Sequence, residues 1–223
     1  MKSINASFII LNKDKINGDE VLEKLESIAR TCYKSENLIT KESKYEFIRG
    51  IIKRGHEAML EHYSLSIKFI CDRGISHELV RHRVASFAQE STRYCNSSGD
   101  KFGNQISVID ISTGFHYDLS NPKDLKKYEV WVEAMSNAEK SYFKMIEDGA
   151  KPEEARSVLP NSLKTEIVVT MNLREWRHFF NLRAVGTTGK PHPQIKEVAS
   201  ELLKEIKTKL PIFFDDIEIN EEK

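Results

Sequence analysis

The chain has 223 residues, of which 39% are hydrophobic and 30% are charged. This composition contains enough core-forming residues to exclude a disordered chain, and the length suits one large domain or two small ones. The 34 Lys and Arg residues balance the 34 Asp and Glu residues, so the formal net charge is zero. This balance argues against a surface that attracts nucleic acid or anionic membranes as a whole, although local basic patches remain possible.

The cellular location is inferred from what the sequence lacks. No apolar run reaches the ~18–20 residues of a membrane span, and the start, MKSINASFIILNKDK, does not resemble a signal peptide. Cys32, Cys71 and Cys95 are too few and too widely spaced for a disulfide framework or a zinc ribbon. We therefore expect a cytoplasmic protein without a membrane partner.

Hydrophobic periodicity predicts helices interleaved with a few strands. The first part of the chain is expected to form a strand at 4–10, helices at 19–33 and 43–54, a strand at 63–71, a helix at 75–85, and then a loop or extended segment to Asp100. The second part is expected to form a strand at 105–109, helices at 122–149 and 152–159, a strand at 164–171, a helix from Asn172, and a final helix at about 193–210. The acidic end, about 215–223, is expected to fray.

Local signals fix several of these boundaries. Asn121 and Pro122 suit the start of the longest helix, and Gly149 suits its end. Asn172 and Glu175 have the spacing of a capping box. Because no repeat or linker interrupts the chain, we predict a single α/β or α+β domain over residues 1–223.

Residues 81–94, RHRVASFAQESTRY, contain a cluster of cations and hydroxyl groups. Arg81, Arg83 and Arg93 offer planar donors that suit phosphate or carboxylate. The cluster therefore predicts a site for an anionic ligand. An exposed basic face and a nucleic-acid patch remain alternatives at this point.

Two other segments are candidates for the same site. Residues 55–62, GHEAMLEH, do not have zinc-protease spacing, because Leu60 stands where the second histidine is required. We expect them to line a pocket rather than to bind metal. Residues 172–184, NLREWRHFFNLRA, place Arg174 and His178 on one helical face, and Arg156 is a further upstream candidate.

The motif of residues 81–93 resembles the signature R-H-R-x-x-S-x-x-x-x-S-x-R of the flavin-dependent thymidylate synthases. The matching residues are Arg81, His82, Arg83, Ser86, Ser91 and Arg93. The segments GHEAMLEH, EEARSVLP and NLREWRHFFNLRA resemble further elements of that family in the same order. The resemblance covers about residues 45–95 and 150–200.

The resemblance implies a fold, an activity and an assembly. The fold would be α+β, a small mixed sheet flanked by helices, assembled as a homotetramer with active sites shared between subunits. The activity would be reductive methylation of dUMP to dTMP in thymidylate biosynthesis. The carbon would come from 5,10-methylenetetrahydrofolate, and FAD reduced by NADPH would carry the hydride. The protein would then orient and polarise the ligands, because the cofactor performs the chemistry.

The resemblance also implies site residues and no metal ligand. FAD would contact Ala58, Arg81, His82, Arg83, Gln89, Asn172, Leu173, Arg174 and His178. The dUMP substrate would contact Glu78, Leu79, Val80, Arg81, Gln89, Glu90, Ser91, Thr92, Arg93, Arg156 and Arg183. Arg183 would be catalytic, because it matches the arginine that stabilises ionised uracil at N3. The sequence departs from the family pattern at Ala58, where a hydroxyl residue is common, at Ala88 and at Gln89.

Two other classes of function compete with this interpretation. A nucleic-acid-binding module would use the arginines of residues 81–93, and its affinity would fall steeply with salt. A metal-dependent hydrolase would use His56, Glu61, His62 and His82. The zero net charge argues against the first, and the spacing of residues 55–62 argues against the second.

Overall fold

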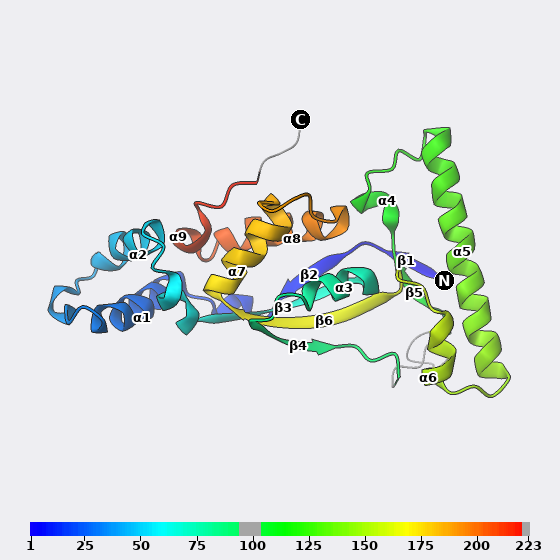
Figure 1. Cartoon of the computed structure of the whole chain (residues 1–223), viewed down its shortest axis with the longest axis horizontal. Coiled ribbons are helices and arrows are strands. Elements are labelled where there is room, and N and C mark those ends of the chain that lie inside the picture. The colour runs from blue at the N-terminus through cyan, green and yellow to red at the C-terminus, as the bar shows by residue number, and fades with distance from the viewer. Residues whose placement is uncertain (94–103, 220–223) are drawn as a thin grey trace. The chain divides into compact units, whose positions relative to one another are not determined.

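The computed structural model describes residues 1–93 and 104–219 and has an α+β fold, with small sheets flanked by helices (Figure 1). The strands are β1 (Lys2–Ile4), β2 (Ser7–Ile10), β3 (Ser64–Asp72), β4 (Ala85–Gln89), β5 (Ser107–Ile109) and β6 (Lys164–Asn172). The helices are α1 (Gly18–Thr31), α2 (Ser43–Lys53), α3 (Arg73–Leu79), α4 (Ile111–Gly114), α5 (Pro122–Glu147), α6 (Pro152–Ala155), α7 (Leu173–Phe180), α8 (Pro193–Lys207) and α9 (Pro211–Phe214). Shorter turns are η1 (Lys13–Lys15), η2 (Glu36–Leu38), η3 (Glu57–His62), η5 (Arg156–Val158) and the π-helical turn η6 (Asn181–Val185).

Residue contacts divide the chain into two compact units. Unit 1 comprises residues 1–8, 68–81 and 87–168, and unit 2 comprises residues 9–67, 82–86 and 169–223. The strand order of the four-stranded sheet is β2-β3-β6-β4, and β1 pairs with β5 in a second sheet. The expectation of a single domain over residues 1–223 stays a prediction.

The core of unit 1 forms between α5 and the two-stranded sheet. The strands β1 and β5 are parallel, with Lys2 opposite Ser107 and Ile4 opposite Ile109, and α5 lies beside them in Figure 1. Buried residues of this cluster are Ile106, Val108, Met135, Tyr142, Ala155 and Leu163. The long helix therefore buries one side and leaves the other to water, as its amphipathic sequence requires.

The core of unit 2 is rich in aromatic rings from α7. Trp176, Phe179 and Phe180 are fully buried and contact one another at ring-centroid distances of 5.3–5.9 Å. The edge of Phe180 meets the ring of Phe214 in α9 at 5.5 Å. The indole Nε1 of Trp176 donates to the carbonyl of Leu65 in β3 at 3.2 Å, so its polar group is satisfied. This packing fixes α7, whose other face carries the candidate site.

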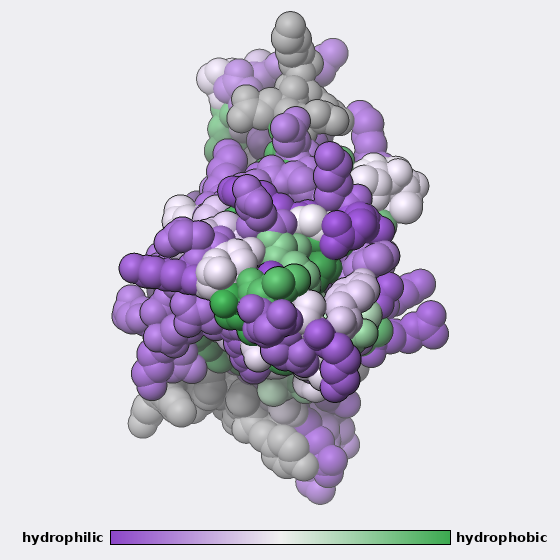
Figure 2. Space-filling view, turned by 90° about the vertical axis from the view of Figure 1, so that its left-hand side faces the viewer, coloured by the Kyte–Doolittle hydropathy of each residue, from purple (hydrophilic) through white to green (hydrophobic). Residues whose placement is uncertain are grey.

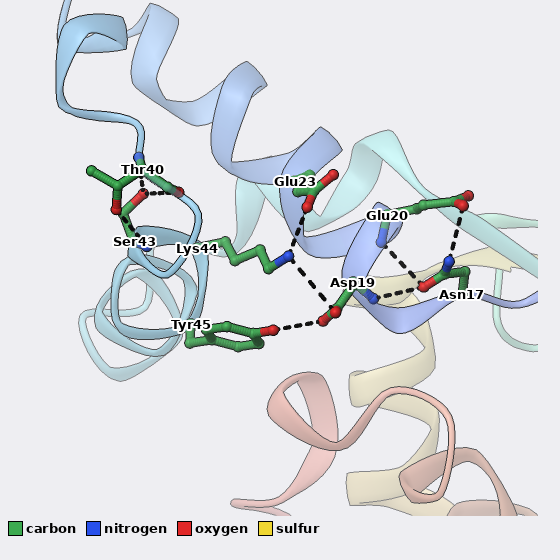
Figure 3. A network of polar contacts seen from close by, with 8 residues as sticks. All are labelled: Asn17, Asp19, Glu20, Glu23, Thr40, Ser43, Lys44 and Tyr45. Carbon is green, nitrogen blue, oxygen red and sulfur yellow. Dashed lines mark hydrogen bonds and ion pairs between the residues drawn. The ribbon is translucent and has the colours of Figure 1, made fainter.

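A polar network joins α1 to α2 in unit 2 (Figure 3). Lys44 is buried, and its Nζ lies 2.7 Å from Glu23 and 3.8 Å from Asp19. The hydroxyl of Tyr45 donates to Asp19 at 2.9 Å, and Asn17 caps the start of α1. The buried cation is thus paired with carboxylates, which is the condition under which a buried charge is tolerated.

The segment between α1 and α2 carries exposed apolar side chains. Leu38 is 58% exposed and Ile39 is 43% exposed. Figure 2 faces this end of unit 2 and shows apolar residues, in green, surrounded by hydrophilic ones. No helix in the described part of the chain is long and apolar enough to cross a membrane.

Most predicted elements are present, with small shifts of their ends. The helices at 19–33, 43–54 and 122–149 correspond to α1, α2 and α5, and the strands at 63–71 and 164–171 correspond to β3 and β6. Asn121 caps α5 and Asn172 caps α7, each by accepting a backbone N–H. The predicted capping residues are therefore confirmed at both helices.

Two predictions of secondary structure are wrong in detail. The single strand expected at 4–10 is two strands, β1 and β2, which belong to different sheets. The helix expected at 75–85 ends at Leu79, and residues 85–89 form strand β4. Val80 and Val84 follow the end of this shorter helix and are exposed, and β-branched residues favour extended chain. The last predicted helix, at about 193–210, corresponds to α8, and the short helix α9 begins after it at Pro211.

The acidic tail begins as an ordered segment. Ile217 is buried, and the carboxylate of Asp216 pairs with Arg177 of α7. The expected fraying concerned about residues 215–223, of which 220–223 lie outside the described residues.

Candidate functional site

The motif residues Arg81–Arg83 form the short connection between α3 and β4. The side chains of Arg81 and Arg83 are exposed, whereas His82 is only 4% exposed. The chain passes from unit 1 to unit 2 between Arg81 and His82. Two of the three residues therefore present a cation at the surface, and the third places its imidazole inside unit 2.

His82 is held by partners at both ring nitrogens. Its Nδ1 lies 3.1 Å from a carboxylate oxygen of Glu175 on α7, and its Nε2 lies 3.3 Å from Nε of Arg183 on η6. A carboxylate accepts and a guanidinium donates, so His82 is neutral with its proton on Nδ1. The ring also packs edge-on against Phe179 at 5.2 Å.

The environment of this group shifts two pKa values. Burial, together with the positive charges of Arg183 and His178, lowers the pKa of His82 to about 4. Burial raises the pKa of Glu175, although His178 and Arg174 act in the opposite direction. The neutral imidazole is thus maintained by its surroundings over the physiological pH range.

A pocket of about 430 Å³ opens beside α7 in unit 2. It is lined by Glu57, Glu61, Val84, Asn172, Arg174, Glu175, Arg177, His178 and Asn181. Three of these, Asn172, Arg174 and His178, are residues that the sequence predicted for FAD. The volume is within the ~300–1,000 Å³ that small-molecule sites usually have.

The cations of this pocket fit the anionic part of a dinucleotide. Arg174 forms an ion pair with Glu61 at 2.6 Å, and both side chains are about half exposed. Such exposed pairs are worth only about 0–1 kcal/mol, so a pyrophosphate could replace the carboxylate at little cost. Glu61 was not among the residues predicted for FAD or dUMP, and it was named only for the competing metal-dependent hydrolase. Its place in GHEAMLEH, a segment expected to line a pocket, was the available signal.

Ala58 and Leu173, two other residues predicted to contact FAD, differ in burial. Ala58 is exposed in η3, whereas the side chain of Leu173 is fully buried in the core. The backbone N–H of Leu173 donates to the carbonyl of Tyr63 at 2.9 Å. A contact of Leu173 with a ligand would therefore not involve the apolar side chain. The same applies to Leu79, predicted for dUMP, which is fully buried in unit 1.

Unit 1 gathers the residues predicted for the dUMP phosphate loop. Gln89 donates to the hydroxyls of Ser76 and Thr165 at 2.9 and 3.2 Å. Glu90 accepts from Lys164 at 3.1 Å, and its own backbone N–H donates to the carbonyl of Glu166 at 2.8 Å. These bonds attach the start of the loop to α3 and β6.

The basic residues of this loop contact α6 and η5. Arg93 pairs with Glu153 at 3.1 Å, and Arg156 donates to the hydroxyl of Thr92 at 3.4 Å. The hydroxyl of Ser91 accepts the backbone N–H of Arg93 at 3.2 Å. The structure thus brings Arg156 beside Thr92 and Arg93, although 63 residues separate Arg93 from Arg156 in the sequence.

Arg73 is a site candidate that the sequence did not reveal. It lines a small pocket of about 80 Å³ in unit 1 together with Glu90 and Thr92. Its Nη1 is buried without a hydrogen-bond partner among residues 1–93 and 104–219. An unsatisfied buried donor is costly, so this atom is a ready site for an anionic oxygen. No spacing rule distinguishes Arg73 from the other arginines, and only burial identifies it.

Two further residues were predicted to contact dUMP. Glu78 and Val80 flank the end of α3, where Glu78 is half-buried and Val80 is exposed. Since Arg81, Gln89 and the loop residues belong to unit 1 while His82, Arg174 and Arg183 belong to unit 2, each unit assembles its own subset of the predicted site.

The residues considered for a metal-dependent hydrolase lie in several places in the structure. In the described residues, His82, Glu175 and His178 place potential ligand atoms within 4.8 Å of one another. The guanidinium of Arg183, however, donates to His82 Nε2 and opposes a cation there. Of the other residues considered for a metal, His56 lies 3.3 Å from the hydroxyl of Tyr33, and Glu61 pairs with Arg174.

The two cysteines in the described part of the chain differ in exposure. Burial raises the pKa of Cys71 to about 12, so its thiol stays protonated. Cys32 is exposed. Cys95 lies outside the described residues.

Comparison with known proteins identifies the family. A family model described as "Thymidylate synthase complementing protein" matches residues 17–212. The flavin-dependent thymidylate synthase of Geobacter sulfurreducens is 35% identical over 196 residues, which is 84% of this chain and 78% of that protein. The chain belongs to the family of flavin-dependent thymidylate synthases. The family named from the motif of residues 81–93 is confirmed.

Other members of the family and a solved structure agree. The flavin-dependent thymidylate synthase of Pyrococcus abyssi is 39% identical over 158 residues, 70% of this chain. This chain covers only 59% of the length of that relative. The crystal structure of the UMP/dUMP methylase PolB from Streptomyces cacaoi matches with a TM-score of 0.76 over 96% of both chains, at 21% identity. This likeness confirms the α+β fold of the flavin-dependent thymidylate synthases.

Proposed function

We propose that the chain catalyses the reductive methylation of dUMP to dTMP. FAD would be the hydride carrier, NADPH its reductant and 5,10-methylenetetrahydrofolate the carbon donor. Membership of the family supports the reaction, and the resemblance of the motif supports the co-substrates. The same resemblance supports a cytoplasmic homotetramer in which subunits share active sites and residues 1–223 form one catalytic domain.

The observation that carries the proposal is that each unit gathers cations at a place where an anionic ligand would bind. In unit 1, Arg93 and Arg156 lie beside Thr92, where a nucleotide phosphate would bind. In unit 2, Arg174 and His178 line the pocket assigned to FAD. Several cations are needed, because dUMP, FAD and folate all carry negative charge.

Each set of residues has a defined task. Arg174 would exchange Glu61 for the FAD pyrophosphate, and Arg183 would stabilise negative charge that develops on the uracil ring. The chemistry that FAD supplies when bound is hydride transfer, so the protein needs no nucleophile. The protonated thiol of Cys71 is consistent with that division of labour.

The experiment that tests the proposal begins with the absorption spectrum of the purified protein after incubation with FAD. We expect retained flavin absorbance and dTMP formation from dUMP when methylenetetrahydrofolate and NADPH are both present. Reactions that omit one co-substrate at a time serve as controls. A protein that takes up no flavin and forms no dTMP would refute the proposal.

A further inference from the structure

Glu175 is connected to Arg183 through His82. The two side chains do not contact each other in the hydrogen bonds described above, because His82 lies between them. Glu175 Oε1 is 3.1 Å from His82 Nδ1, and His82 Nε2 is 3.3 Å from Arg183 Nε. All three residues belong to unit 2, so their geometry is defined within one compact body.

The direction of each hydrogen bond follows from the chemistry of the two ends. The carboxylate of Glu175 has no proton to give at neutral pH, so it accepts the Nδ1–H of His82. The guanidinium of Arg183 has only donors, so it requires a lone pair on Nε2. A neutral imidazole satisfies both ends in only one of its two tautomers, the one with the proton on Nδ1.

The surroundings support this arrangement. His82 is 4% exposed and packs against Phe179, so the ring cannot turn away without opening the core. The backbone N–H of Glu175 is held by the cap Asn172 at 2.9 Å. Arg183 sits on the π-helical turn η6, a distortion that is frequent at functional sites.

We propose that Glu175 is a positioning residue, which fixes the tautomer of His82 so that Nε2 holds the guanidinium of Arg183 in place. The two hydrogen bonds form a relay from Glu175 through His82 to Arg183. The importance of this relay for catalysis rests on the proposed function, in which Arg183 stabilises charge on the uracil ring. Residues of this kind, which orient a ligand-contacting group through a hydrogen bond, typically alter activity by about 10–100-fold when they are removed.

The test compares Glu175→Ala, which removes the acceptor, with Glu175→Gln, which preserves volume and an acceptor oxygen. Glu201→Gln, on the exposed face of α8, is the control for loss of a carboxylate. The first readout is the tautomer of His82, observed by nitrogen NMR of histidine-labelled protein and assigned with a His82→Gln spectrum. The second is the kcat and the dUMP KM of each variant.

We expect wild type and Glu201→Gln to show a proton on Nδ1 and none on Nε2. Glu175→Ala is expected to lose that tautomer and to reduce kcat by about 10–100-fold, with a smaller change in KM. Glu175→Gln is expected to recover part of both. If Glu175→Ala does not fold, Glu175→Gln tests the proposal instead. A positioning role requires that the population of the Nδ1–H tautomer and the kcat of this variant fall together.

Failure of the relay can be separated from failure of the proposed function. A wild type that forms no dTMP would refute the proposed function, and the tautomer would still test the relay. An active wild type whose Glu175→Ala variant retains either the Nδ1–H tautomer or full kcat would overturn the relay. A wild-type protein with the proton on Nε2 would overturn it as well.

Discussion

His82 should make the stability of the fold depend on pH in a specific direction. Burial, with Arg183 and His178 nearby, lowers the pKa of His82 to about 4, against about 6.5 in an unfolded chain. Between these values the unfolded chain binds a proton that the folded protein does not. The contribution of His82 to stability is therefore complete above about pH 6.5 and is lost as the pH falls towards 4.

The size of the effect follows from the pKa difference. One pKa unit corresponds to about 1.4 kcal/mol, so a lowering of about 2.5 units predicts a loss of about 3 kcal/mol. A domain typically has only about 5–15 kcal/mol of stability, so the loss is measurable. Glu175, whose pKa burial raises, contributes in the opposite direction, and a comparison of variants must therefore keep it in place.

The assay is urea unfolding of wild type and of His82→Gln, followed by circular dichroism between about pH 7 and pH 4.5. Glutamine cannot titrate, and Glu175 remains in both proteins. We expect the difference in unfolding free energy between wild type and variant to shrink by about 2 kcal/mol over this range, because the full effect is reached only below about pH 4. A difference that stays constant over this range would refute the burial of a neutral His82.

Two further predictions concern arginines with different partners. Arg177 is buried and pairs with Glu57 at 2.9 Å and Asp216 at 2.6 Å, so Arg177→Met is expected to lower the unfolding free energy by about 3 kcal/mol, measured in urea. A change well below about 1 kcal/mol would show that these pairs do not stabilise the fold. Arg73→Leu is expected to weaken dUMP binding at least about tenfold in calorimetry, because its buried Nη1 has no hydrogen-bond partner in the described part of the chain. Unchanged binding by a folded variant would remove Arg73 from the nucleotide site.

The elements that the sequence predicted well are those fixed by local interactions. Asn121 and Asn172 cap their helices through backbone groups only two or three residues away, and such caps can be recognised without knowing the fold. The amphipathic periods of α1, α2 and α5 are equally local. The motif of residues 81–93 indicates a family, and membership of that family implies the fold.

The elements that were missed depend on distant partners. The residues of β1 pair with β5, more than 100 positions away, while β2 joins another sheet. Periodicity within residues 4–10 contains no information about that division. Arg73 and Glu175 were missed as site residues for the same reason. An orphaned Nη1 and a carboxylate placed against a buried imidazole exist only after the chain has folded.

The partners of three arginines in unit 2 indicate which of them stabilise the fold and which are suited to bind a ligand. Arg177 is enclosed by two carboxylates and a backbone carbonyl, which neutralise it and commit it to the core. Arg174 has an exposed carboxylate partner that an anionic ligand can displace. Arg183 donates to the imidazole of His82, a partner that is itself neutral. Under the proposed function, in which Arg183 stabilises negative charge on the uracil ring, a neutral imidazole is a suitable partner, because a carboxylate in place of His82 would reduce the positive charge available to the substrate.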